Sequence, residues 1–174
     1  MNPSWIVRTA RLLLRPVAWT DLAELRAIKA DPRVFAVMLG GVRSPVQTAE
    51  ELAADIAAWG ARGIGMWSVR TPDDEAFHGV VGVTERPDGR GMGLRYALWP
   101  DSQGHGFARE AAGGALRYAH ERAGLGRVIA VAREDNIASR MVLGGIGMVE
   151  CESFVRDGER LLIYESIRHP PSWR

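Results

Sequence analysis

Residues 94–110, LRYALWPDSQGHGFARE, decide how the rest of this 174-residue chain is interpreted. The stretch begins with apolar residues typical of a β-strand, and Pro100 ends that strand because proline has no amide hydrogen for a ladder. A glycine-rich turn over residues 103–108 follows, and a helix begins directly after it. Backbone amides at such a helix N-terminus form a nest that suits a phosphate or diphosphate. Glycine at positions 104 and 106 lets an anion reach backbone that a Cβ would shield.

The composition is that of one globular domain of ordinary size, with 47% hydrophobic and 25% charged residues. Lysine and arginine number 22 and acidic residues 21, and the resulting net charge of +1 argues against nucleic acid or an anionic membrane as a partner. We expect no transmembrane helix, since no apolar run is long enough, and no signal peptide at the N-terminus. Cys151 is the single cysteine, so no internal disulfide can form, and a cytoplasmic location is the simplest interpretation.

Capping signals and apolar periodicity predict four helices. The first has Thr20 as its N-cap, and the second has a Ser44 capping box and ends at Gly60. The third is expected from Gly106 to about Ala123, and the fourth is short and is capped by Asn136. The loop over residues 34–43, between the first two helices, is a candidate lining for an acceptor pocket, because binding residues favour loops on a rigid scaffold.

Alternating or continuous apolar runs predict seven strands, at residues 11–17, 65–70, 77–85, 94–99, 128–132, 148–155 and 160–167. The last two form a hairpin with Asp157-Gly158 as its turn, and residues from His169 onward lead out of the domain. The strands at residues 65–70, 77–85 and 94–99 form an antiparallel meander ahead of the glycine turn, which disfavours a dinucleotide-binding fold. Arg109 also stands where the third glycine of Gly-x-Gly-x-x-Gly would fall.

Two short patterns lie at strand–helix junctions. Gln103-x-x-Gly106-x-Ala108 is the first, and Asn136-x-x-Ser139 followed by Gly147-Met148 is the second. Together they resemble the signatures of the GNAT N-acetyltransferases, and the sequence around the first is similar to the RimJ/RimL-like branch, which acetylates protein N-terminal amines and other amines. The resemblance covers nearly the whole chain, from Leu12 to Ile167.

The resemblance implies an α/β (α+β) fold with a mixed, mostly antiparallel, V-splayed sheet of about seven strands and about four helices. It implies one domain over residues 1–174, with a core at about 8–168, and acetyl-CoA held between the fourth and fifth strands without any metal. In the order of the chain, the residues expected to bind acetyl-CoA are Leu98, Trp99, Gln103, Gly104, His105, Gly106, Phe107, Ala108, Arg109, Asn136 and Ser139. The amides near Leu98 would polarise the thioester carbonyl, and the Asn136 amide suits the pantetheine arm.

The proton donor and the base are less clear from the sequence. Many relatives carry a tyrosine seven residues after the asparagine as the acid, but this chain has Leu143 there, so Ser139 is the substitute candidate. Leu98 likewise stands where some relatives carry a glutamate base. Glu85 is the best remaining carboxylate. His78, His105 and Glu152 are weaker alternatives, and Cys151 is an unfavoured covalent carrier, since a lone buried cysteine usually acts as a small apolar residue.

The sequence therefore predicts an N-acetyltransferase that moves an acetyl group from acetyl-CoA to a primary amine by direct transfer in a ternary complex. A protein N-terminus, an amino acid, a polyamine and a drug amine all stay open as acceptors. The alternative is a non-catalytic acyl-CoA-binding module with this fold, and a nucleotide-dependent oxidoreductase ranks far behind it. A homodimer is common in the branch, but nothing in the sequence indicates one.

Overall fold

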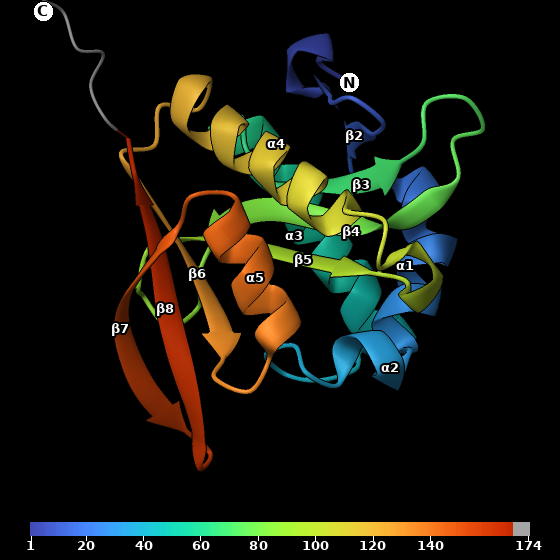
Figure 1. Cartoon of the computed structure of the whole chain (residues 1–174). Helices are drawn as coiled ribbons and strands as arrows, with labels where there is room; N and C mark the ends of the chain where they lie inside the picture. Colours follow the sequence, from blue (N-terminus) through green and yellow to red (C-terminus); the bar gives the residue numbers. More distant parts are fainter. Residues whose placement is uncertain (169–174) are drawn as a thin grey trace, which may run out of the picture.

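The computed structural model describes residues 1–168, and its eight strands form one sheet in the order β1-β2-β3-β4-β5-β6-β8-β7 (Figure 1). The strands are β1 (Val7–Arg8), β2 (Leu13–Pro16), β3 (Met66–Arg70), β4 (Phe77–Glu85), β5 (Met92–Leu98), β6 (Arg127–Arg133), β7 (Val149–Arg156) and β8 (Glu159–Ile167). The α-helices are α1 (Leu22–Ala30), α2 (Pro32–Phe35), α3 (Pro45–Arg62), α4 (Phe107–Glu121) and α5 (Ile137–Gly145). Three short 3₁₀ segments are η1 (Pro3–Trp5), η2 (Trp19–Asp21) and η3 (Pro100–Ser102).

The sheet splits between β5 and β6, the only parallel pair in it. On one side of the split, residues 79–85 of β4 pair with residues 92–98 of β5, and on the other side β6 pairs with β8 over its whole length. Between the two halves, only Gly93 lies opposite Ile129. Figure 1 shows β5 and β6 running apart from that point. The V-splayed, mostly antiparallel sheet predicted from the sequence is therefore confirmed.

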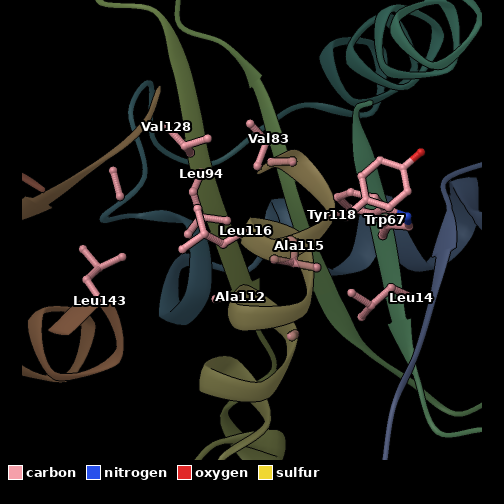
Figure 2. Close-up of a cluster of buried hydrophobic side chains, with 14 of the residues drawn as sticks. Leu14, Trp67, Val83, Leu94, Ala112, Ala115, Leu116, Tyr118, Val128 and Leu143 are labelled. Atoms are coloured by element: carbon pink, nitrogen blue, oxygen red, sulfur yellow. The ribbon is translucent and has the colours of Figure 1, made fainter. Parts of the chain in front are cut away.

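Two hydrophobic clusters fill the opposite faces of the sheet. Under α4, Leu94 and Leu98 of β5 pack with the fully buried Ala112 and Ala115 (Figure 2). On the other face, Ala97 packs in the cluster formed with α1, α2 and α3. Because successive strand residues point to opposite faces, β5 presents its even-numbered side chains toward α4 and its odd-numbered ones toward α3. This alternation decides which β5 side chains lie on each face of the sheet.

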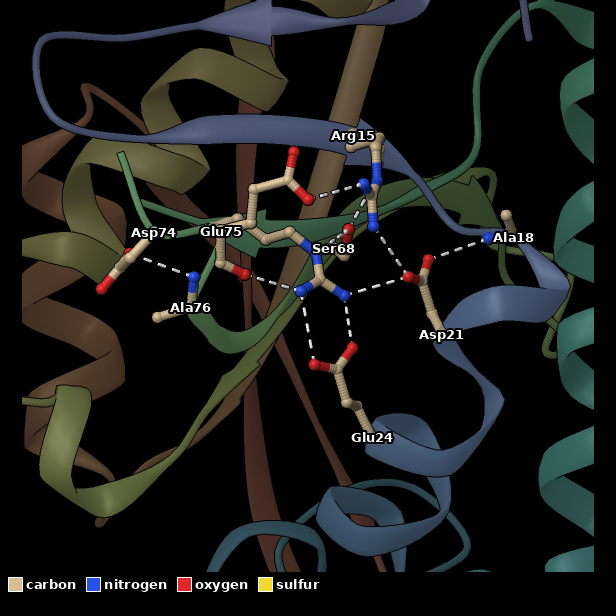
Figure 3. A network of polar contacts seen from close by, with 9 residues as sticks. Arg15, Ala18, Asp21, Glu24, Ser68, Asp74, Glu75 and Ala76 are labelled. Atoms are coloured by element: carbon tan, nitrogen blue, oxygen red, sulfur yellow. Dashed lines mark hydrogen bonds and ion pairs between the residues drawn. The ribbon is translucent and has the colours of Figure 1, made fainter. Parts of the chain in front are cut away.

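A buried ion network joins β2, β3 and the start of α1 (Figure 3). The Asp21 carboxylate is completely buried and accepts hydrogen bonds from the Ala18 amide at 2.9 Å, Arg15 Nη2 at 3.1 Å and Arg70 Nη2 at 2.9 Å. Arg70 also donates to both carboxylate oxygens of Glu24. Every charge in this network therefore has an opposite partner, which a buried charge requires.

The helix predictions were correct in outline and wrong in three details. Thr20 is not the N-cap of the first helix, because η2 precedes α1 and Asp21 occupies the cap position. Gly60 does not end α3, which continues to Arg62 and ends at Gly63, whose left-handed φ of 65° suits the C-terminal position. The fifth helix, α2, was not predicted, although the Asp31 side chain caps it by accepting from the Arg33 amide.

The strand predictions missed only the two-residue β1, so the sheet has eight strands rather than about seven. The Asp157-Gly158 hairpin turn is confirmed, with positive φ at both residues, 52° and 77°, as a type I′ turn requires. The segment expected to lead out of the domain, residues 169–174, lies outside the described residues. Among residues 1–168, no helix is both long and apolar enough to cross a bilayer.

Candidate active site

The turn between β5 and α4 exposes a row of unpaired backbone amides. Gly104 and Gly106 adopt left-handed conformations with φ of 79° and 78°, which turn the chain into the first turn of α4. Within residues 1–168, the amides of residues 104–109 donate to no protein acceptor, whereas the Gln103 amide donates to the Pro100 carbonyl at 3.1 Å. Consecutive free amides at a helix N-terminus form the anion-binding geometry expected from the sequence.

Arg11 and Glu110 fix this turn against the start of β2. Arg11 donates from Nη1 to the His105 carbonyl at 2.8 Å and from Nε to Glu110 at 2.8 Å. Glu110 also accepts from the Thr9 hydroxyl at 2.5 Å and from the Arg11 amide at 2.7 Å. Burial acts to raise the pKa of Glu110, but these hydrogen bonds and the Arg11 charge outweigh it and hold the pKa below its ordinary value. The turn is thus preorganised by charged groups that leave its amides free.

The residues around the turn fit a diphosphate. An added Cβ at Gly104 would meet nothing within 4 Å, so open space lies in front of this backbone. The Arg109 guanidinium, on the first turn of α4, has no ion pair or hydrogen bond within the described residues and lies near Gly145 of α5. Positive charge and free amides at one helix N-terminus favour an anion. The Gln103 side chain is used differently, since it donates to the Leu98 carbonyl at 3.2 Å.

The edge of β5 that faces β6 carries further free amides. The Trp99 amide donates to the His78 carbonyl at 2.9 Å, so this residue bonds toward β4. Hydrogen bonding alternates along an antiparallel ladder, and the amides of Tyr96 and Leu98 therefore point toward β6. The strands have already parted there, which leaves both amides facing the split. Leu98 thus has the orientation expected of a carbonyl-polarising amide. The Trp99 side chain packs against the cluster on the α3 face and does not line the cavity that runs along the split.

Two hydroxyl groups, one on β5 and one on α5, meet beside the split between β5 and β6. The Tyr96 hydroxyl lies 3.0 Å from Ser139 Oγ and 3.4 Å from the Ser139 carbonyl oxygen. Asn136 caps α5 by accepting from the Ser139 amide at 3.1 Å. Burial raises the pKa of Tyr96, and the hydrogen bond with Ser139 only partly opposes that effect. The phenol therefore keeps its proton at neutral pH and can donate it.

Tyr96 was not among the predicted catalytic residues. The family resemblance predicted the acid at the position seven residues after Asn136, on the following helix, and this chain has Leu143 there. That side chain is 1% exposed and belongs to the core under α4 and α5. The signal that could have found Tyr96 is the alternation along β5, which places it on the same face as Leu94 and Leu98 and therefore toward α5.

The predicted base candidates lie in different places. Glu85 lines the cavity described below, but its side chain is 61% exposed and pairs with Arg62 at 2.5 Å. It lies opposite Met92, and Tyr96 is four residues further along β5, a rise of roughly 13 Å. The two predicted catalytic residues, Glu85 and Ser139, are therefore not brought together.

The weaker base candidates and the cysteine also lie away from Tyr96 and Ser139. Burial lowers the pKa of His78, whose Nδ1 lies 2.8 Å from Ser102 Oγ. His105 is exposed in the glycine turn, and Glu152 is exposed on β7, 3.5 Å from Arg90. Cys151, expected to be buried, is instead exposed on β7 and does not line the cavity. This position gives no support to a covalent route through its thiol.

One cavity of about 1120 Å³ connects these features. Its lining includes the glycine turn, the free edge of β5, the C-terminal half of β6 and the N-terminal part of α5. It continues to the other side of the sheet, where residues 33–40, the middle of α3 and the turn after β4 line it. The cavity can therefore hold a long ligand in the split and a second ligand on the α3 side. Within the described residues, no group of three or more potential metal-binding side chains is present.

The chain is similar in sequence to known acetyltransferases. Residues 11–149 match the family described as the acetyltransferase (GNAT) domain. A curated relative, FsC-acetyl coenzyme A-N(2)-transacetylase of Aspergillus fumigatus, is 30% identical over an alignment 162 residues long, which covers 85% of this chain and 66% of the relative. The chain therefore spans slightly less than two thirds of that relative's length.

Solved structures share the fold over almost the whole chain. An acetyltransferase from Agrobacterium tumefaciens superposes with a TM-score of 0.81 at 28% identity, covering 92% of this chain and 93% of the other. RimL, a ribosomal alpha-N-protein acetyltransferase in complex with coenzyme A, gives a TM-score of 0.76 at 19% identity and covers 93% and 97% of the two chains. The second likeness concerns the fold alone. From the match over residues 11–149, together with the splayed sheet and the amide-lined turn, we conclude that the chain belongs to the GNAT family of acetyltransferases.

Proposed function

We propose that this protein transfers an acetyl group from acetyl-CoA to a primary amine, by direct transfer while both substrates are bound. The observation that carries the proposal is the row of free amides at residues 104–109, which opens on the split between β5 and β6. A diphosphate at this row would direct the rest of a coenzyme into the split. Family membership supports the same assignment, since GNAT acetyltransferases use acetyl-CoA.

The contacts of each residue suggest its role in binding the coenzyme or in transferring the acetyl group. The amides of residues 104–108 and the Arg109 guanidinium bind the diphosphate. Asn136 caps α5 with its side-chain oxygen. Its side-chain nitrogen has no hydrogen-bond partner within residues 1–168 and is free to donate to the pantetheine arm. Acetyl-CoA supplies the activated thioester. The Leu98 amide polarises its carbonyl, and Tyr96, oriented by Ser139, donates a proton to the departing thiolate. The amine attacks in its neutral form, the proton that its nitrogen loses passes to water, and Tyr96 is reprotonated from water.

The acceptor is an amine, which the names of the relatives support. One of them acts as an N(2)-transacetylase and another as an alpha-N-protein acetyltransferase. The second also supports placing this chain near the RimJ/RimL-like branch, although its identity is only 19%. We place the acceptor on the α3 side of the cavity, lined by the loop that follows α2.

A matched pair of variants at Gly104 tests the coenzyme site. Aspartate and asparagine tolerate the left-handed conformation about equally and have the same shape, and no neighbour lies within 4 Å of the new Cβ. We expect Gly104→Asp to weaken acetyl-CoA binding about tenfold or more relative to Gly104→Asn, because it adds a negative charge beside a diphosphate. Isothermal calorimetry measures both constants, and equal affinities would show that the diphosphate binds elsewhere.

Turnover separates an enzyme from a non-catalytic acyl-CoA-binding module of the same fold. With acetyl-CoA and a panel of amines, we expect release of free thiol that depends on the amine. Tight coenzyme binding without thiol release on any amine would favour the binding module.

A further inference from the structure

Asp55 is a buried carboxylate without a partner. It lies on the core-facing side of α3, in one stripe with Thr48, Leu52 and Trp59, and is only 9% exposed. Within residues 1–168 it makes no hydrogen bond and no ion pair, yet it lines the large cavity. Its oxygens are not fully buried, so they reach the cavity surface, but a mostly buried carboxylate without a partner still lowers folding stability. A carboxylate kept unpaired in the wall of a cavity indicates a cationic ligand.

Arg95 is the complementary feature on the opposite wall. It lies on β5 among the odd-numbered residues, which face α3, and it also lines the cavity. Within the described residues its guanidinium makes no hydrogen bond and lies more than 4 Å from every carboxylate. Its charge nonetheless acts on Asp55, whose pKa is raised by burial and lowered in part by Arg95 and Lys29. The two unpaired charges therefore face the same space without touching.

The other charged groups at this end of the cavity are already paired. Glu51 accepts from Lys29 Nζ at 2.6 Å and from Arg43 Nε at 2.5 Å. Arg33 pairs with Asp31 at 2.7 Å, and Arg86 pairs with Asp88 at 2.6 Å. Asp55 and Arg95 thus differ from these groups in having their polar atoms available.

We propose that Asp55 and Arg95 form a two-point acceptor subsite for small amines that also carry a carboxylate, with the amino group, which arrives as an ammonium, at Asp55 and the carboxylate at Arg95. The ammonium gives up a proton to water before its nitrogen attacks the thioester. The inference rests on the proposed function and narrows its acceptor class to amino acids and related amino carboxylates. A guanidinium binds carboxylates in bidentate fashion, and a buried carboxylate binds ammonium through charge-assisted hydrogen bonds. Polyamines lack the acidic group, and a peptide N-terminus has an amide where an amino acid has its carboxylate.

The test compares amino acids with their own carboxamides. Thiol release at saturating acetyl-CoA is measured for glycine, β-alanine and 4-aminobutanoate, for the carboxamide of each, and for spermidine. For at least one pair we expect kcat/KM of the acid to exceed that of the carboxamide about tenfold or more. Arg95→Gln should reduce that ratio to about one. Arg133→Gln, a cavity arginine already paired with Glu159 at 2.7 Å, should preserve it. A wild-type ratio near one, or a ratio that Arg95→Gln leaves intact, would overturn the proposal.

Asp55→Asn tests the other point. We expect kcat/KM for the acceptor to fall about thirtyfold or more, mainly through KM, with acetyl-CoA binding within about twofold of wild type. The melting temperature should equal or exceed that of wild type, because the variant removes an unpaired buried charge. Loss of activity together with a lower melting temperature would assign Asp55 a structural role and contradict the subsite.

Failure of the proposed function and failure of the acceptor subsite give different experimental results. If acetyl-CoA binds but no amine releases thiol, the proposed function fails and the acceptor subsite fails with it. If carboxamides and spermidine are acetylated as well as the amino acids, the acetyltransferase function stands and only the subsite is wrong.

Discussion

At the scale of single residues, the proposed proton donor, Tyr96, is the clearest case in which position in the fold matters more than sequence spacing. The helix position where relatives carry a tyrosine holds Leu143, a core residue with no proton to give. Tyr96 reaches the same split from β5, where its hydroxyl meets Ser139 Oγ at 3.0 Å. Because burial raises the pKa of this phenol, its protonated form persists through the neutral range, and it is lost only as the pH rises through that raised value.

Tyr96→Phe should therefore lower kcat by about 10- to 100-fold while changing KM for acetyl-CoA much less, because it removes a proton donor and leaves the ring. Steady-state kinetics with thiol detection measure both constants. Ser139→Ala is the matched control. It leaves the phenol in place and should cost less than Tyr96→Phe. An unchanged kcat in Tyr96→Phe would exclude this residue as the donor.

The glycine turn with its free amides, proposed above as the coenzyme site, could be located from the sequence, whereas the proposed acceptor side could not. Gly104, Gly106 and Asn136 act through local backbone geometry, which short motifs describe well. Asp55 and Arg95 are 40 residues apart, and only the packing of α3 on β5 brings them to one cavity. In the sequence, Asp55 is one carboxylate in an amphipathic helix, and its burial without a partner becomes visible only in three dimensions.

At the scale of elements, the α1 region depends on the charges that tie it to β2 and β3. Asp21 ends η2 and opens α1, and it is the shared partner of Arg15 and Arg70 (Figure 3). The capping rules expected Thr20 here, because they consider local backbone and not a pair of arginines that arrive from two strands. The carboxylate serves those arginines and the Ala18 amide together.

Asp21→Ala should reduce the free energy of unfolding by about 3–5 kcal/mol, because Arg15 and Arg70 lose the one fully buried counter-charge that they share. They keep only the more exposed Glu75 and Glu24 as partners. The melting temperature should fall by roughly 10 °C, as calorimetry or circular dichroism can measure. Glu75→Ala is the matched control, since Glu75 pairs with the same Arg15 but its side chain is 61% exposed. That change should cost less than about 1 kcal/mol. Equal losses in the two variants would contradict the network's role.

At the scale of the whole molecule, the two halves of the split sheet are joined by the turn after β4. Asp88 in that turn pairs with Arg86 at 2.6 Å and reaches Arg156 of β7 at 3.4 Å. Arg90 of the same turn lies over the Phe154 ring of β7, 4.1 Å from its centroid. These contacts bridge β4 and β5 to the β6–β8–β7 half, which pairs with β5 only at Gly93. That residues 1–174 form one domain stays a prediction, supported by this continuity.

Asp88→Asn should weaken the joint in a pH-dependent way. Hydrogen bonds from Arg86, together with the Arg90 amide, lower the pKa of Asp88 to about 2. A lowered pKa stabilises the fold above the ordinary carboxyl value of 3.8, and that contribution is lost as the pH falls toward 2. Urea unfolding should therefore show wild type about 1–2 kcal/mol more stable than the variant at pH 6. The difference should shrink steadily below pH 4, and a difference independent of pH would contradict the assignment.

The cavity through the split sheet has a consequence for the order of events in catalysis. Its lining reaches the glycine turn beside α4 on one side and the loop after α2 on the other. On the proposed assignment, acetyl-CoA occupies the first end and the amine the second, so neither substrate has to cross the other's binding site. Neither of them therefore has to bind first.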